Sequence, residues 1–200
     1  TNTLNNIYAP GINIIGCSGE NISTLENINI KNSIDSTGGI YINKCYGVTV
    51  KGCTVDTTTD FGVNISESNN INVLNSQITN TGSSGVFVNK SNTINLQKNV
   101  FNNTNTNENK SQYVIYIKSD STADLDVTNA TENTFSSGKK VYKTEGTKAK
   151  LNVNKNILYL YNYITNVYSL ETKWWRTGMN VQGEDVIPDI LKVVFGRVRV

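Results

Sequence analysis

Three glycines, Gly39, Gly62 and Gly85, follow one another at intervals of 23 residues, and the residues around them repeat in phase. The segment Gly-Ile-Tyr-Ile-Asn-Lys-Cys at Gly39 aligns with Gly-Val-Asn-Ile-Ser-Glu-Ser at Gly62 and with Gly-Val-Phe-Val-Asn-Lys-Ser at Gly85. A fixed period of this length is typical of a solenoid in which each repeat forms one turn. The period therefore limits the possible folds more strongly than any other feature of the chain.

Apolar and polar residues alternate within each repeat, which is the pattern of a strand with one buried face. Three short strands joined by polar turns account for one repeat. The side chains expected to point inward are Ile40, Ile42, Val63, Ile65, Val86 and Val88 on the first strand, Val48, Val50, Ile71, Val73, Ile94 and Leu96 on the second, and Val55, Ile78 and Phe101 on the third. We therefore expect each repeat to be one coil of an all-β parallel β-helix, with coils stacked about 4.8 Å apart.

The period continues in both directions, although insertions lengthen it. Upstream, we expect a coil built from Ile12/Ile14 and Ile28/Ile30, lengthened by a loop around residues 18–25. A polar insertion at residues 102–112 precedes the downstream coils. The inward residues expected there are Ile115, Ile117, Leu125, Val127, Phe135, Val141, Leu151 and Val153. These additions give about six coils and a β-helix domain over residues 1–155.

The character of the chain changes after residue 156. Both tryptophans, all three arginines and the single methionine lie beyond this point. A segment this small cannot bury so many large apolar side chains on its own, so we expect it to associate with further copies of the chain. Residues 156–200 are therefore expected to form a small β-rich module for oligomerisation or capping. The residues expected at the interface are Tyr159, Tyr161, Tyr163, Trp174, Trp175 and Phe195.

Composition excludes several classes of function. The formal net charge is only +2, so nothing indicates binding to nucleic acid or to an anionic membrane. The chain contains no histidine, which excludes Ser-His-Asp and Cys-His catalysis and most zinc sites. We expect neither a metal site nor a cofactor. No stretch is apolar for long enough to insert into a membrane.

The chain has three cysteines, an odd number that cannot form a complete set of disulfides. The repeat places Cys45 in one turn position with Ser68 and Ser91, and Cys53 in another with Ser76 and Asn99. We interpret these cysteines as small residues packed at turns, in preference to a redox or ligand-binding role.

The in-phase units follow the pattern G-[VI]-x-[VI]-x-x-[SC]-x-x-[VI]-x-[VIL]. Over residues 11 to 155 they resemble the right-handed parallel β-helix superfamily, which includes pectate lyases, polygalacturonases and phage tailspikes. The aromatic segment that follows resembles the trimerisation or capping module of a tailspike or tail fibre. The resemblance implies a right-handed, single-stranded parallel β-helix in a homotrimer, located in a virion tail or outside the cell.

A tailspike-type protein would bind a bacterial surface polysaccharide during host recognition, and in some cases cleave it. One alternative is a structural or adhesive module without catalysis, whose catalytic coils lie upstream of Thr1. Such a chain would be a fragment or a processed product, since it begins with Thr rather than Met. Another is a secreted pectin-type lyase or hydrolase. The β-helix segment has no arginine, so the lyase pattern is not evident and a glycoside hydrolase is favoured among enzymes.

Glycoside hydrolysis requires two carboxylates about 5–10 Å apart, one as acid and one as base or nucleophile. Asp35 and Asp56 are expected in nearly equivalent turns of adjacent coils, and Asp60 follows in the same loop as Asp56. These three residues are the candidate catalytic set. Asp is also common in turns because its side chain hydrogen-bonds the nearby backbone, so a purely structural role is the alternative.

An outward column of side chains is expected on the first strand of successive coils. It consists of Tyr41, Asn64, Phe87 and Tyr116. Aromatic rings in this position can stack on sugar rings along the helix axis, or they can pack against a neighbouring subunit, where aromatic residues are enriched. The pair Trp174 and Trp175 poses the same choice between sugar binding and an oligomer core.

Overall fold

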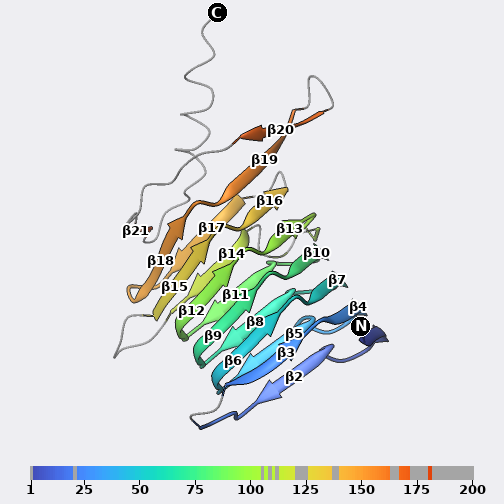
Figure 1. Ribbon diagram of the computed structural model, residues 1–200, viewed down its shortest axis with the longest axis vertical. Helices are drawn as coiled ribbons and strands as arrows, with labels where there is room; N and C mark the ends of the chain where they lie inside the picture. Colours follow the sequence, from blue (N-terminus) through green and yellow to red (C-terminus); the bar gives the residue numbers. More distant parts are fainter. Residues whose placement is uncertain are drawn as a thin grey trace, which may run out of the picture.

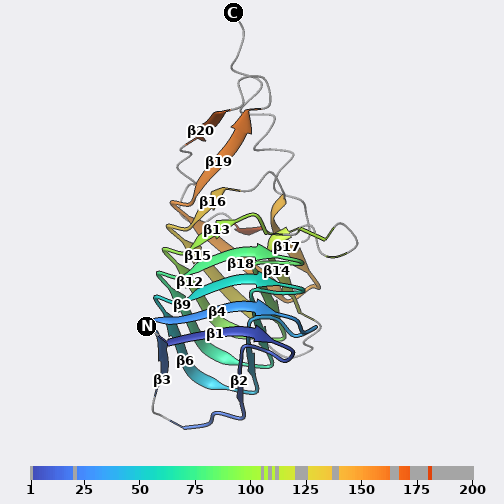
Figure 2. The same ribbon diagram turned by 90° about the vertical axis from the view of Figure 1, so that its right-hand side faces the viewer.

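The computed structural model describes residues 2–19, 22–104, 106–107, 110, 113–119, 126–136, 140–162, 167–171 and 180–181, with side chains as far as residue 157. The described chain forms strands and no helix, and the strands stack along one axis (Figures 1 and 2). None of its segments is therefore a helix that could cross a membrane.

The strands belong to three sheets, which run along three sides of the coil. Sheet A contains β1 (Asn2–Ile7), β4 (Ile28–Ser33), β7 (Thr54–Thr58), β10 (Gln77–Thr81), β13 (Val100–Asn102), β16 (Thr134–Ser136), β19 (Ile157–Asn162) and β20 (Val167–Glu171). Sheet B contains β2 (Ile12–Ile15), β5 (Ile40–Asn43), β8 (Val63–Ser66), β11 (Val86–Asn89), β14 (Tyr113–Lys118) and β17 (Lys140–Glu145). Sheet C contains β3 (Ser23–Glu26), β6 (Tyr46–Lys51), β9 (Asn69–Leu74), β12 (Asn92–Gln97), β15 (Asp126–Thr131), β18 (Ala149–Asn154) and β21 (Asn180–Val181).

Every third strand along the chain lies in the same sheet and pairs in parallel with its predecessor, as β5, β8 and β11 do. One coil therefore consists of a strand from B, a strand from C and a strand from A. From the first to the sixth strand of sheet B, the chain makes five complete turns, close to the number of coils expected. The all-β parallel β-helix predicted from the repeat is confirmed. Antiparallel pairing begins only at β20 and β21.

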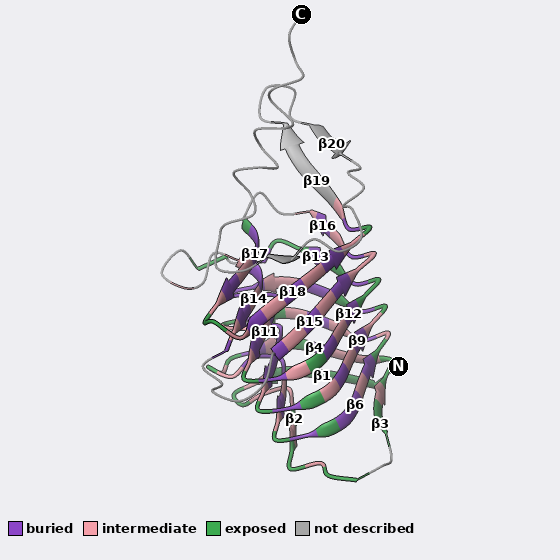
Figure 3. Ribbon diagram, turned by 90° about the vertical axis from the view of Figure 1, so that its left-hand side faces the viewer, coloured by how far each residue is buried: buried purple, intermediate pink, exposed green. Residues whose placement is uncertain are grey.

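Buried residues alternate with partly exposed ones along the strands of the coil (Figure 3), and the buried apolar side chains form one core cluster. All fifteen side chains expected to point inward from the three regular repeats are at most 1% exposed. Full burial of a Val, Ile or Phe side chain stabilises a fold by about 1.5–3 kcal/mol. Strand alternation alone was therefore sufficient to identify the core of these coils.

The periodic glycines leave room for the core at the corner between sheets A and B. A Cβ atom added at Gly62 would lie 2.4 Å from Cγ2 of Ile78 and 2.6 Å from the carbonyl oxygen of Gly85. At Gly85 it would lie 2.7 Å from the ring of Phe101. Each glycine thus makes space for the inward side chain of the third strand in its own coil, which explains the 23-residue spacing.

Two expectations for the irregular coils are wrong. The loop expected around residues 18–25 contains strand β3, which pairs with β6 in sheet C. Val127 was expected to point inward, but Thr128 and Ala130 occupy the inward positions opposite Ile94 and Leu96. An insertion lengthens this coil, so its residues no longer follow the period of 23. The inward residues there are polar or small, and an assignment based on apolar residues is therefore shifted by one position toward the N-terminus.

Buried asparagines stack at the turn between sheets C and A. The Oδ1 atom of Asn133 accepts hydrogen bonds from the backbone N–H of Asn99 at 2.9 Å and from its side-chain amide at 3.1 Å. The side-chain amide of Asn133 donates to the carbonyl of Leu96 at 2.8 Å, and its backbone N–H donates to Asn156 at 2.7 Å. This stack satisfies backbone groups that would otherwise be buried without partners.

We predict that Asn133→Ala lowers the free energy of unfolding by about 2–4 kcal/mol, because it leaves several buried polar groups without partners. Asn95→Ala is the matched control, since Asn95 belongs to a similar ladder on the outer face of sheet C, where solvent can replace the lost bonds. We expect a loss below about 1 kcal/mol for this control. Urea denaturation followed by circular dichroism measures both values. Equal losses would show that the inner stack has no special role.

Candidate functional site

The four residues expected in the outward column lie on consecutive strands of sheet B. The register places Tyr41 beside Asn64, Asn64 beside Phe87 and Phe87 beside Tyr116. Phe87 lies between the inward residues Val86 and Val88 and therefore points away from the core. The column itself is thus present as the repeat predicted.

Four aromatic rings form a continuous row on this face, which we call the aromatic row: Phe61, Phe87, Tyr116 and Tyr113. The rings of Phe61 and Phe87 stack with centroids 4.7 Å apart and planes 12° apart. The Phe87 and Tyr116 centroids are 5.2 Å apart, and those of Tyr116 and Tyr113 are 6.4 Å apart. All four rings are partly exposed. The row therefore presents aromatic surface to solvent across three successive coils.

The aromatic row and the predicted column overlap only in part. Phe61 and Tyr113 lie outside the strict repeat position, and sequence reasoning missed both. Phe61 is in the turn immediately before Gly62, and Tyr113 opens β14. Asn64 is only 7% exposed, and it separates Tyr41 from the row. The sequence does hold a sign of both residues, since each is an aromatic residue three positions before a member of the column.

Charged side chains hold Tyr116 in place within the row. The hydroxyl of Tyr116 donates a hydrogen bond to Oε2 of Glu145. This bond, together with Lys143 and Lys118, lowers the pKa of Glu145 to about 2, so the carboxylate is charged at neutral pH. The Nζ atom of Lys143 also lies 5.0 Å from the centroid of the Tyr116 ring, within the range of a cation–π contact. The ring is therefore held from its edge and from its face.

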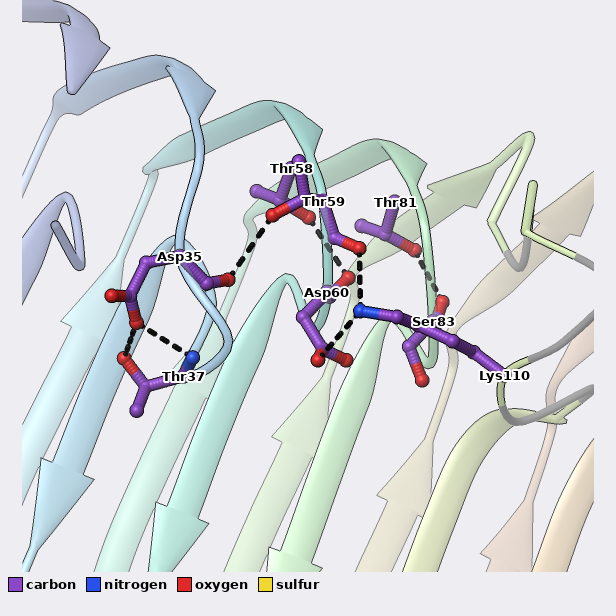
Figure 4. A network of polar contacts seen from close by, with 8 residues as sticks. All are labelled: Asp35, Thr37, Thr58, Thr59, Asp60, Thr81, Ser83 and Lys110. Carbon is purple, nitrogen blue, oxygen red and sulfur yellow. Dashed lines mark hydrogen bonds and ion pairs between the residues drawn. The ribbon is translucent and has the colours of Figure 1, made fainter. Parts of the chain in front are cut away.

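Asp35 and Asp60 lie in neighbouring turns between sheets A and B (Figure 4). The carboxylate of Asp35 accepts hydrogen bonds from the backbone N–H of Thr37 at 2.7 Å and from the Thr37 hydroxyl. The hydroxyl of Thr59 donates to the backbone carbonyl of Asp35 at 3.2 Å, which links the two turns. The Asp35 carboxylate thus has the local turn contacts that the structural alternative predicted.

The Asp60 carboxylate anchors the insertion at residues 102–112. Its Oδ2 atom is 2.8 Å from Nζ of Lys110, and the same Nζ donates to the carbonyl of Thr59 at 3.0 Å. The Asp60 side chain is only 14% exposed. The insertion also bonds with the intervening turn, through the backbone N–H of Asn107 and the carbonyl of Gly82 at 3.0 Å. Lys110 therefore reaches back two coils and joins the insertion to the turn that directly precedes Phe61.

Asp56 does not lie in a turn, which corrects the position expected for it. It is on strand β7, where it pairs with Lys31 of the neighbouring strand in sheet A. Ser33 pairs with Thr58, and two residues beyond the end of each strand the same register aligns Asp35 with Asp60. Burial raises the pKa of Asp56, but hydrogen bonds from Thr79 and Asn80, both 2.7 Å long, outweigh it and leave the pKa below its ordinary value. Asp56 is thus a charged residue of sheet A, on a different sheet from the aromatic row.

A polar groove of about 530 Å³ lies at the opposite edge of sheet B, at the corner with sheet C. Its lining residues are Tyr46, Asn69, Asn70, Lys90, Asn92, Thr93 and Asp126. The strands of sheet B are mostly four residues long, or about 13 Å. The aromatic row is therefore bordered by the carboxylate turns at one edge and by this groove at the other. Nothing in the repeat pattern pointed to the groove.

The residues expected at a subunit interface are not described in the structure at the level of their side chains. Tyr159 and Tyr161 lie on β19, but only their backbone is described. Tyr163, Trp174, Trp175 and Phe195 lie outside the described residues. Among the side chains that are described, no group of three or more His, Cys, Asp or Glu residues is placed to hold a metal ion.

Comparison with known proteins gives one match. The family model described as "Right handed beta helix region" matches residues 1–162, which is most of the chain. No curated protein matches the chain at a significant level. No solved structure does so either.

We predict that Lys110→Ala frees the insertion, because it removes both bonds to the turn at Thr59 and Asp60. Hydrogen exchange at the backbone amide of Asn107 should accelerate severalfold, while the free energy of unfolding falls by about 1 kcal/mol or less. Lys98→Ala is the control, since it removes an exposed ion pair with Glu132, outside the insertion. Unchanged exchange at Asn107 in the Lys110 variant would contradict the anchoring role of this residue.

Proposed function

The chain belongs to the right-handed β-helix family, and from this premise we propose that it binds a bacterial surface polysaccharide along the outer face of sheet B. The observation that carries the proposal is the aromatic row of Phe61, Phe87, Tyr116 and Tyr113. Parallel β-helices often bind polysaccharides or act on them.

The row has properties that suit a sugar chain. Aromatic rings offer a flat apolar surface to the C–H face of a sugar, and the tyrosine hydroxyls add polar contacts. The row crosses three coils, so it extends for about 10 Å along the helix axis, the scale of a short oligosaccharide. Because Glu145 and Lys143 already hold Tyr116, little side-chain entropy would be lost on binding. The polar groove beside Tyr46 offers amide groups to hydroxyls at the edge of such a chain.

We predict that Phe87→Ala weakens polysaccharide binding at least tenfold, because Phe87 contacts rings on both sides and lies at the centre of the row. Asn72→Ala is the matched control, because Asn72 occupies an outward position on sheet C. Titration calorimetry against a panel of purified bacterial capsular and cell-wall glycans measures both affinities, and circular dichroism checks folding. Equal affinities of the two variants would contradict binding at the row, and binding of no glycan would contradict the function.

Cleavage of the bound polysaccharide is a second candidate function, which one observation favours. Asp60 directly precedes Phe61, so a carboxylate lies beside the first ring of the row, and Asp35 lies in the neighbouring turn. The contacts of Asp60 with Lys110 and of Asp35 with Thr37 favour a structural role instead, and this would leave a protein that only adheres.

Product analysis separates these possibilities. Release of new reducing ends indicates hydrolysis, and unsaturated products indicate a lyase. If Asp60 and Asp35 carry out hydrolysis, Asp60→Asn and Asp35→Asn abolish it, whereas Asp56→Asn on sheet A leaves the rate unchanged. Persistent hydrolysis in the first two variants would exclude them as catalytic residues. No release by the unmodified chain would leave binding as the only function.

We also propose that the chain is a homotrimeric tailspike-type receptor-binding protein of a phage virion, in which residues 156–200 hold three chains together. The support is the concentration of large apolar and aromatic residues in that segment. Light scattering of the purified chain should give three times the monomer mass of 22.0 kDa. Removal of residues 163–200 should give monomers. A monodisperse monomer of the full chain would overturn this proposal.

A further inference from the structure

Cys17 and Cys45 occupy the same position on consecutive coils. The register pairs Ile15 with Asn43, and both cysteines follow two residues later. The pairing continues beyond the strands, because the backbone N–H of Tyr46 donates to the carbonyl of Cys17 at 2.7 Å. The first of these cysteines therefore lies directly above the second along the helix axis.

The sulfur of Cys45 is turned toward the coil that carries Cys17. Its Sγ atom accepts a hydrogen bond from the backbone N–H of Cys17 at 3.3 Å and donates one to the carbonyl of Ile14 at 3.4 Å. The nearby side chain of Cys45 raises the pKa of Cys17, in agreement with this arrangement. Cys45 is buried, whereas Cys17 is partly exposed.

We propose that Cys17 and Cys45 are a disulfide-forming pair that cross-links the first coil of the β-helix to the second. In-register strands lie about 4.8 Å apart, which is within the Cα–Cα range of about 4.4–6.8 Å that a disulfide spans. The first coil lies at the edge of the stack, where β2 and β3 each pair on one side only. The Sγ atom of Cys45 already lies 3.3 Å from the backbone nitrogen of Cys17, so it reaches the residue that it would join.

The reaction is a thiol–disulfide exchange with a small disulfide such as oxidised glutathione. The thiolate of Cys17, the more accessible cysteine, attacks one sulfur of the oxidant and releases one molecule of the reduced thiol. The thiolate of Cys45 then attacks Cys17 and releases the second. Two protons leave the protein thiols and two electrons pass to the oxidant, so that one S–S bond is broken and one is formed. The cross-link joins residues 28 positions apart.

Cys53 provides an internal control for this pair. Its sulfur also points toward the preceding coil, where it donates to the carbonyl of Leu25 at 3.6 Å, and its side chain is likewise buried. The register pairs Thr54 with Asn29, so the residue above Cys53 is Ile28, which has no thiol. Cys53 is therefore buried in a turn as Cys45 is, but the residue aligned with it on the preceding coil is not a cysteine.

The test treats the full chain with oxidised glutathione, blocks the remaining thiols after unfolding, and maps the peptides by mass spectrometry. We expect a Cys17–Cys45 cross-link, a mass lower by two hydrogens, and Cys53 as the single blocked thiol. Cys53→Ser should form the same cross-link, and Cys17→Ser should form none within the chain. Backbone amide exchange in β2 should slow about tenfold or more in the cross-linked chain. A mixed disulfide that persists on Cys17, or cross-links that include Cys53 as often as Cys45, would overturn the proposal.

Discussion

Each coil of this protein hydrogen-bonds with the coil before it and the coil after it, and its own three strands do not pair with one another. The parallel register fixes which residues of successive coils lie above one another, and everything else follows from that alignment. The core arises because inward apolar residues stack on similar residues, as Ile42 does on Ile65 and Ile65 on Val88. The buried asparagines stack in the same way, so each satisfies the backbone of its neighbour.

The regular coils could be predicted from the sequence because strand alternation and a constant residue count describe the same geometry. The prediction failed where the count changed. Strand β3 contains a single partly buried apolar residue, Leu25, so it lacks the alternation that marks the other strands. The loop before it also changes the number of residues in the coil, so the period does not locate the strand. At Thr128 and Ala130 the inward positions lack large apolar side chains, so hydrophobicity no longer marks them.

The candidate site shows the same division. The column through Phe87 and Tyr116 follows from register and could be derived from the repeat. The stacking of Phe61 on Phe87 depends on the path of a turn, which periodicity does not describe. Asp56 was placed wrongly because the end of β7 is not visible in the sequence. The contact between Lys110 and Asp60 joins residues 50 positions apart through an insertion, and no local pattern encodes it.

The insertion at residues 102–112 leaves the stack around it unchanged. The step between the stacked turn residues increases from 23 residues between Ser76 and Asn99 to 34 between Asn99 and Asn133, and then returns to 23 at Asn156. The parallel register places six of the additional residues before β14 and five between β14 and β15. The scaffold therefore tolerates a change in loop length without a change in register. Because the insertion borders the aromatic row, evolution or design can vary the loop that a ligand would meet while the coils that support it stay the same. Loop length and strand register are in this sense encoded in separate parts of the repeat.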